Sequence, residues 1–391
     1  MPGRARRWFT MLALPLSVLA AATAVAAASP RFVPEDPDFV VADLTQSQPD
    51  EPLRRLLASW RAEPDAEQNV IALAQAFIDR ARSRREPRYF GRAEALLARK
   101  ASLPGAGADL RRLYAETLQF RHDFAAAEHI LNELLREQPH DTDSRLRRGS
   151  LRLTRGDFAG ARTDCAQLAL ARGATAPAGI ACLAEALAGS GELERARLLL
   201  DAMARDSAAL EPAARAYLLT TRAELSERAG DLVNAIAAYE QASRLAPQDD
   251  SIRAALSDVR RLRGDANATE PLAVNSPSLA LLVRQAMLAP AGDPLRSRAR
   301  DWLQLEMARG DAIHYRESAL LALSEQRAAD ALTAARRNFE TQRELADVRV
   351  LAQAAVLAKD AAATDELRRW LQATGYQDRI TAGILARAVR G

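Results

Sequence analysis

Five short stretches recur along the chain at a nearly constant spacing, and this recurrence limits the possible folds more than any other feature. The stretches are RHDFAAAEHIL from Arg121, RGDFAGARTDC from Arg155, SGELERARLLL from Ser190, AGDLVNAIAAY from Ala229 and RGDANATEPLA from Arg263. Between their second residues the spacings are 34, 35, 39 and 34 residues. A period of this length indicates one supersecondary unit that is repeated and stacked on its neighbours.

Each residue type in the stretch has a structural reason. The second residue is glycine in four stretches, and glycine can take the left-handed conformation that ends a helix. The acid after it can cap the next helix, and an apolar residue can then pack under the turn. A small residue three positions later lets two helices cross closely. These small residues are Ala127, Ala161, Ala196 and Ala235, and their expected partners are Ala115, Gly149, Ala184 and Ala223.

The triplet Arg155-Gly156-Asp157, which returns at Arg309-Gly310-Asp311, matches an adhesion ligand. Turn chemistry already accounts for a glycine and an acid at this place. We therefore interpret the triplet as a joint between two helices.

This pattern resembles the tetratricopeptide repeat, a helical hairpin, most clearly between Ala108 and Leu262. The resemblance also rests on Tyr114 and Leu183 in the first helix and on Pro139 and Pro247 at the repeat end. Overall, the chain is similar to secreted bacterial repeat proteins without an established activity. The resemblance implies an all-α fold, a right-handed superhelical α-solenoid whose concave face binds other polypeptides.

The second repeat departs from the family pattern. Arg145, Arg148 and Arg152 occupy positions that are usually apolar, so the register of residues 142–156 stays open. His122 replaces the glycine in the first joint.

Composition agrees with an all-α fold, because alanine, leucine and arginine dominate and only 5% of residues are aromatic. The predicted parts are a signal peptide (1–28), a poorly ordered linker (29–51), the repeat array (52–265), an irregular break (266–277) and degenerate repeats with a capping helix (278–391). Beyond the clear repeats, helices are expected at 66–84, 88–100, 279–288, 295–309, 312–326, 328–341, 345–359, 361–374 and 377–390.

The amino end has the order of a secretory signal: a basic start, an apolar run and small residues for cleavage near Ala26–Ala28. The alternative is an uncleaved inner-membrane anchor. Removal of Arg4, Arg6 and Arg7 would leave 51 basic residues against 51 acidic ones. A near-neutral chain gives no reason to expect nucleic acid or a membrane surface as partner. The protein is therefore expected in the periplasm or outside the cell.

Reactive groups do not converge in the sequence. The four histidines lack metal-ligand spacing, and no phosphate-binding glycine loop or nucleophile elbow is present. We expect no enzyme activity, no cofactor and no metal.

The concave face is the better candidate for a site. One inward-facing position of the repeat carries Glu116, Ser150, Glu185, Glu224 and Asp258, and Arg112, Gln119, Phe120, Tyr217 and Glu227 lie nearby. Family members that clamp a terminal carboxylate use lysine and asparagine there, so a basic or amine-bearing segment fits this acidic stripe better. The alternative is that glutamate serves only as a soluble helix former.

Two function classes remain: a periplasmic scaffold that binds a protein or peptide, or an accessory subunit of a cell-envelope enzyme, transporter or secretion complex. The identity of the partner and the oligomeric state are not indicated.

The two cysteines of the chain, Cys165 and Cys182, are expected on neighbouring antiparallel helices at similar heights from the turn between them. Export would place them where thiols oxidise, which favours a disulfide between adjacent repeats. The alternative is two small buried thiols.

Overall fold

The computed structural model describes residues 34–35, 50–84, 88–171, 173, 175–205, 210–274, 278–309 and 314–387. The predicted signal peptide and almost all of the predicted linker lie outside these residues. The described residues belong to one compact unit, Phe32–Gly391, to which the following description is confined.

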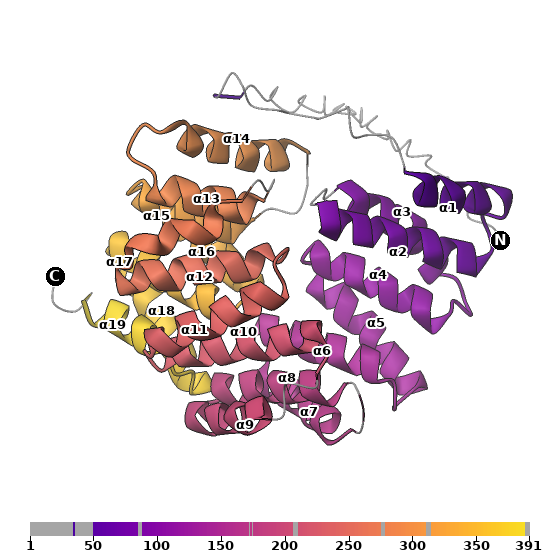
Figure 1. Ribbon diagram of the computed structural model, residues 1–391, viewed down its shortest axis with the longest axis horizontal. Coiled ribbons are helices and arrows are strands. Elements are labelled where there is room, and N and C mark those ends of the chain that lie inside the picture. The colour runs from indigo at the N-terminus through magenta and orange to yellow at the C-terminus, as the bar shows by residue number, and fades with distance from the viewer. Residues whose placement is uncertain are drawn as a thin grey trace, which may run out of the picture. The chain divides into compact units, whose positions relative to one another are not determined.

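The described part of the chain is all-α and contains no strand (Figure 1). Its elements are α1 (Glu51–Ala62), α2 (Glu67–Arg84), α3 (Arg88–Ala101), α4 (Ala108–Phe120), α5 (Phe124–Glu137), α6 (Thr142–Arg155), α7 (Phe158–Leu170), α8 (Ala176–Gly189), α9 (Leu193–Arg205), α10 (Pro212–Arg228), α11 (Leu232–Leu245), α12 (Asp250–Arg263), the 3₁₀ helix η2 (Ala266–Leu272), α13 (Leu279–Leu288), α14 (Pro294–Arg309), α15 (Tyr315–Ser324), α16 (Ala328–Thr341), α17 (Leu345–Leu357), α18 (Ala361–Thr374) and α19 (Arg379–Arg387). Consecutive helices pack as hairpins, which makes the described part of the chain an α-solenoid of helical hairpins.

The joints have the predicted geometry. The four joint glycines, Gly156, Gly191, Gly230 and Gly264, all have a positive φ, from 75° to 87°. Three of the acids that follow a joint position, Asp123, Asp157 and Asp231, accept a hydrogen bond of 2.9–3.2 Å from the backbone N–H three residues on. The Arg155-Gly156-Asp157 triplet is therefore the end of α6 and the cap of α7.

His122 keeps the joint conformation without being glycine. Its φ is 61°, and Gln326 and Lys359 take similar values, 57° and 54°, in the joints before α16 and α18. The left-handed conformation strains a residue that has a Cβ. In the His122 joint the imidazole ring stacks on Phe124, with the ring centroids 5.5 Å apart.

Small residues lie where hairpin helices cross. Ala127, Ala161, Ala196 and Ala235 are each 0% exposed, and the partners Ala115, Gly149, Ala184 and Ala223 are also buried. The close crossing explains why the second helix of each hairpin carries alanine at this position.

The segment predicted as an irregular break contains η2, and η2 is packed rather than loose. Ala268 and Leu272 are buried, Ser257 Oγ donates to the Ala268 carbonyl at 2.7 Å, and Gln285 Nε2 donates to the Leu272 carbonyl at 2.8 Å. The regular helix α12 ends at Gly264, which has a positive φ, and Pro271 lies inside η2. Residues 275–277 lie outside the described part of the chain.

The carboxyl-terminal helices also contact repeats that are far away in the sequence. The backbone N–H of Arg343 donates to the Thr154 carbonyl at 2.7 Å, and its guanidinium donates to the Arg155 carbonyl at 3.1 Å. Farther along, Arg228 Nε donates to the Gln377 carbonyl at 2.9 Å. One apolar core joins residues of α6–α8 with residues of α13–α19.

Candidate binding site

Five of the predicted groove residues line one cavity of about 540 Å³. They are Glu185, Tyr217, Glu224, Glu227 and Asp258, and Ser150 of the same repeat position joins them. These residues come from α6, α8, α10 and α12, the first helices of successive hairpins. Further lining comes from α13, α15, α17 and the turns around them, and from Phe158 of α7 and Tyr239 of α11.

The other four predicted groove residues do not line this cavity. Arg112 binds Asp141 at 2.9 Å, and Glu116 is 6% exposed and binds Arg147 at 2.7 Å. Phe120 stacks on Phe90 with the ring centroids 3.6 Å apart, and Gln119 is half-buried on α4. The first repeats therefore use these positions for packing between helices.

The acids of the predicted stripe do not form a purely negative surface in the cavity. Six acids and six arginines line the cavity, and Glu227 is only 4% exposed. Asp258 binds Arg284 at 2.8 Å, and Glu227 binds Arg349. The repeat pattern could not reveal this compensation, because the arginines come from α13 and α17, outside the clear repeats.

Glu185 and Glu224 differ from the other cavity acids, because neither forms an ion pair with an arginine within the described residues. Glu185 instead accepts hydrogen bonds from Thr221 Oγ1 at 2.8 Å and Tyr217 Oη at 3.1 Å. Burial raises the pKa of Glu185 to about 7. Burial, together with the charge of Glu185, also raises the pKa of Glu224 well above its usual range. These two carboxyl groups are the least compensated acids of the cavity.

The cavity residues that sequence reasoning missed lie on the carboxyl-terminal helices. Arg349 binds both Glu227 and Asp378, and all three side chains are buried. Arg316 binds Asp347 and Glu344. A signal was present in the paired acidic and basic residues of α15 and α17, but the repeat pattern is too weak there to orient them.

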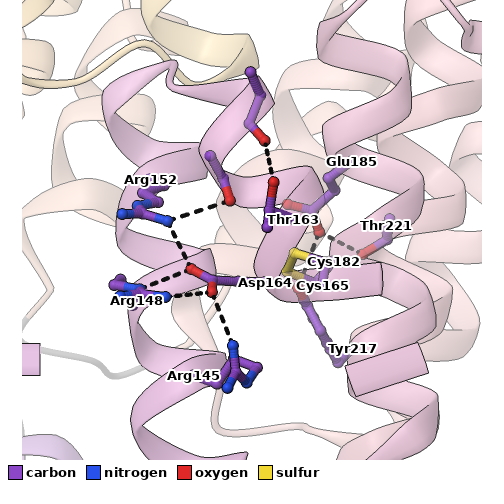
Figure 2. The surroundings of a disulfide bond; sticks show 12 residues. Arg145, Arg148, Arg152, Thr163, Asp164, Cys165, Cys182, Glu185, Tyr217 and Thr221 are labelled. Atoms are coloured by element: carbon purple, nitrogen blue, oxygen red, sulfur yellow. Dashed lines mark hydrogen bonds and ion pairs between the residues drawn. A yellow bond between two sulfur atoms is a disulfide. The ribbon is translucent and has the colours of Figure 1, made fainter. Parts of the chain in front are cut away.

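The register of the second repeat is resolved by Asp164, which the sequence analysis did not single out. Asp164 is 0% exposed on α7 and binds three arginines of α6 (Figure 2). The nitrogen–oxygen distances are 2.6 Å to Arg148, 2.9 Å to Arg152 and 3.5 Å to Arg145. The arginines thus replace apolar contacts with a buried ionic cluster.

The predicted disulfide between Cys165 and Cys182 is present, with the Cα atoms 5.4 Å apart. It joins α7 to α8 beside the Asp164 cluster (Figure 2). Both sulfurs face Gly149 of α6, where an added Cβ would lie 3.1 Å and 3.2 Å from them. The small residue at this crossing therefore makes room for the bridge.

Metal chemistry has no candidate in the described residues, where no group of three or more histidine, cysteine, aspartate or glutamate side chains could hold an ion. Among the described helices, none combines the length and apolarity needed to cross a membrane.

No protein-family model matches the chain, and a search of curated proteins found no match. Among solved structures, the APC/C hetero-tetramer Cut9-Hcn1 aligns at 16% identity and a TM-score of 0.49. The alignment covers 83% of this chain and 64% of that structure's chain. A tetratricopeptide repeat protein from Parabacteroides merdae aligns at 15% identity and a TM-score of 0.43, covering 66% of this chain and 98% of its own. Yeast Tom70 aligns at 12% identity and a TM-score of 0.42, and the alignment covers 86% of this chain and 84% of the Tom70 chain.

Proposed function

We propose that the protein is an exported, non-catalytic scaffold that binds a polypeptide partner at the concave face of its repeat stack. The observation that carries this proposal is the convergence of Glu185, Tyr217, Glu224, Glu227 and Asp258 on one cavity. Solenoid proteins present such inner surfaces to extended partners. The cavity volume of about 540 Å³ lies in the range of sites for small ligands, so a short segment of the partner would enter it.

The inserted segment carries a basic group. Glu227 and Asp258 already have arginine partners, whereas Glu185 and Glu224 form no ion pair with an arginine of the described residues. A lysine, an arginine or an amino terminus would supply the missing positive charge and would favour ionisation of both carboxyl groups. Tyr217 lines the same cavity and is only half-buried, so it offers aromatic surface to the aliphatic part of such a side chain.

Export is supported by the sequence of the amino end and by the disulfide, because protein disulfides persist in oxidising compartments. Amino-terminal sequencing of the protein isolated from its native cells tests this part. A mature chain that starts after Ala26 or Ala28 is expected, and a chain that retains Met1 or Trp8 would contradict it.

Partner binding is tested with a photo-crosslinking amino acid in place of Thr220, which lines the cavity, and in place of Glu340, which is exposed on α16. A partner from envelope extract should crosslink at position 220 and not at position 340. Glu185→Gln with Glu224→Gln should weaken the crosslink and its salt dependence. A partner that crosslinks only at position 340, or that ignores both glutamine substitutions, would refute binding at the cavity.

A further inference from the structure

The segment between α12 and α13 contains a short sequence that the proposed binding site does not use. It reads Asp265-Ala266-Asn267-Ala268-Thr269. An asparagine followed two residues later by serine or threonine, with no proline between them, is the acceptor sequence for N-linked glycans in exported proteins. Bacterial enzymes that transfer such glycans also read an acid two residues before the asparagine, and Asp265 stands there. No other asparagine of the chain has a serine or threonine two residues later.

The two residues that define this acceptor sequence lie on the surface. Asn267 and Thr269 are exposed, whereas Ala268 between them is buried. Ser257 Oγ on α12 donates to the Ala268 carbonyl at 2.7 Å. The alanine therefore anchors the segment on α12, and the side chains on either side of it remain in solvent.

The side-chain amide of Asn267 takes no part in holding this turn. The backbone does so, because the Asn267 N–H donates to Asp265 Oδ1 at 2.9 Å and the Asn267 carbonyl accepts from Arg260 Nη1 at 3.0 Å. Within the described residues, the Asn267 side chain forms no hydrogen bond to the rest of the protein. The amide is therefore available for reaction without any loss of a bond that stabilises the fold.

The other asparagines of the described residues are hydrogen-bonded through their side chains. These bonds join Asn69 to the Ser59 carbonyl, Asn132 to Arg148, Asn234 to Asp231 and Asn338 to Asp347. A structural role thus accounts for those side chains, whereas nothing in the fold accounts for the side chain of Asn267.

The joint beside the acceptor sequence is open, unlike joints that the carboxyl-terminal helices cover. A Cβ added at Gly156 would lie 3.0 Å from the Arg343 side chain, and a Cβ added at Gly191 would lie 3.0 Å from the Gly375 carbonyl oxygen. Around Gly264, by contrast, a Cβ would meet no atom of the described residues within 4 Å. A bulky group can therefore approach the segment that follows Gly264.

We propose that Asn267 is an N-glycosylation site, with the glycan attached to Nδ2 and directed into solvent. The proposal rests on the export part of the proposed function and adds a covalent modification to it. No described residue of the segment 264–272 lines the cavity, so the glycan is compatible with a partner bound there.

The donor is an oligosaccharide carried on a lipid pyrophosphate. Asn267 Nδ2 forms a bond to the anomeric carbon of the first sugar, and the bond between that carbon and the pyrophosphate oxygen breaks. The lipid pyrophosphate leaves with the electron pair of the broken bond. Nδ2 gives up one of its amide protons to a base of the transferase, so the product is a secondary amide.

The test is mass spectrometry of the protein isolated from its native cells. Cleavage after arginine gives the peptide Gly264–Arg284, which contains the whole acceptor sequence. We expect this peptide to carry the mass of a glycan and its fragment ions to place the glycan on Asn267. Asn275 lies in the same peptide and serves as an internal control, because Ser276 and Pro277 follow it and do not complete an acceptor sequence.

Variants produced in the same cells separate recognition of the sequence from effects on the fold. Thr269→Ala should abolish the glycan, and Thr269→Ser should keep it, because serine retains the hydroxyl group that the transferase reads. Asn267→Gln should abolish the glycan as well. The matched control is Asn234→Gln, which changes an exposed asparagine without an acceptor sequence and should leave the glycan in place.

The same digest distinguishes failure of this proposal from failure of export. An unmodified Gly264–Arg284 peptide in a chain that starts after Ala26 or Ala28 would overturn the proposal and leave export standing. A glycan that persists in Asn267→Gln would also overturn it, because the sugar would then lie on another side chain. A chain that retains Met1 and has an unmodified Asn267 would contradict both.

Discussion

Asp164→Asn is the substitution that most directly tests the ionic cluster in the second repeat. Asparagine keeps the size of the side chain but removes the negative charge that faces Arg145, Arg148 and Arg152. Asp164 is fully buried, and its three partners are only 12–18% exposed. Removing one partner of a buried ion pair typically costs about 3–5 kcal/mol, because the remaining charges are left without compensation.

The structure places the expected loss at the lower end of that range. Arg152 also binds Glu128 at 2.9 Å, Arg148 also binds the Asn132 side chain at 2.8 Å, and Arg145 also donates to the Pro139 carbonyl, so all three cations keep a polar partner. We therefore expect Asp164→Asn to lower the free energy of unfolding by about 3 kcal/mol.

The assay is urea unfolding of the full chain followed by circular dichroism, with Glu340→Gln as the matched control. Glu340 forms an exposed pair with Arg337 on α16, where both side chains are more than half exposed. Exposed pairs contribute little to stability, so the control should leave the unfolding midpoint unchanged. If Asp164→Asn shifts the midpoint no more than the control does, the arginines are compensated by other groups and the reasoning fails.

Three further predictions concern the bridge and the joints. Cys165→Ala with Cys182→Ala should lower the free energy of unfolding by about 3 kcal/mol in a denaturant titration, because the disulfide no longer closes a loop between residues 17 apart in the unfolded chain. An unchanged free energy of unfolding would mean that the disulfide does not stabilise the fold. Gly149→Val should cost about 1–3 kcal/mol from overpacking against the two sulfurs, and a double-mutant cycle should show a smaller cost once both cysteines are alanine. Lys359 has a left-handed backbone with φ of 54°, which glycine adopts without strain, so Lys359→Gly should raise the thermal unfolding midpoint. The expected gain in the free energy of unfolding is up to about 1 kcal/mol. A lower midpoint would show that this joint is unstrained.

Local features of the fold could be predicted from the sequence, because their causes are local. The spacing of Gly156, Gly191, Gly230 and Gly264 predicted the joints, and the predicted 328–341 and 361–374 helices coincide with α16 and α18. The disulfide followed from helix geometry and from there being just two cysteines. Each of these inferences depends on residues within one or two repeats.

The candidate site could be predicted only in part, because its environment is built by distant segments. Glu185, Glu224 and Asp258 of the inward-facing position line one cavity, whereas Glu116 of the same position does not line it and is buried. The partners Arg349 and Arg284 lie on helices whose repeat pattern is degenerate. No local period relates α10 to α17, so the ion pair between Glu227 and Arg349 could be found only in three dimensions.

The long-range contacts of α17 and the turn before it change how this solenoid should unfold. Repeat arrays usually behave as one-dimensional chains in which each unit is coupled only to its neighbours, so the ends can fray independently. Here hydrogen bonds span 122 to 190 residues of sequence, from α10 to α17 and from α6 to the turn before α17. These bonds couple α17 and the turn before it to α6 and α10, so the helices α6–α19 should unfold as one cooperative block. The first helices, α1–α4, share a separate core, so they should exchange their amide hydrogens earlier.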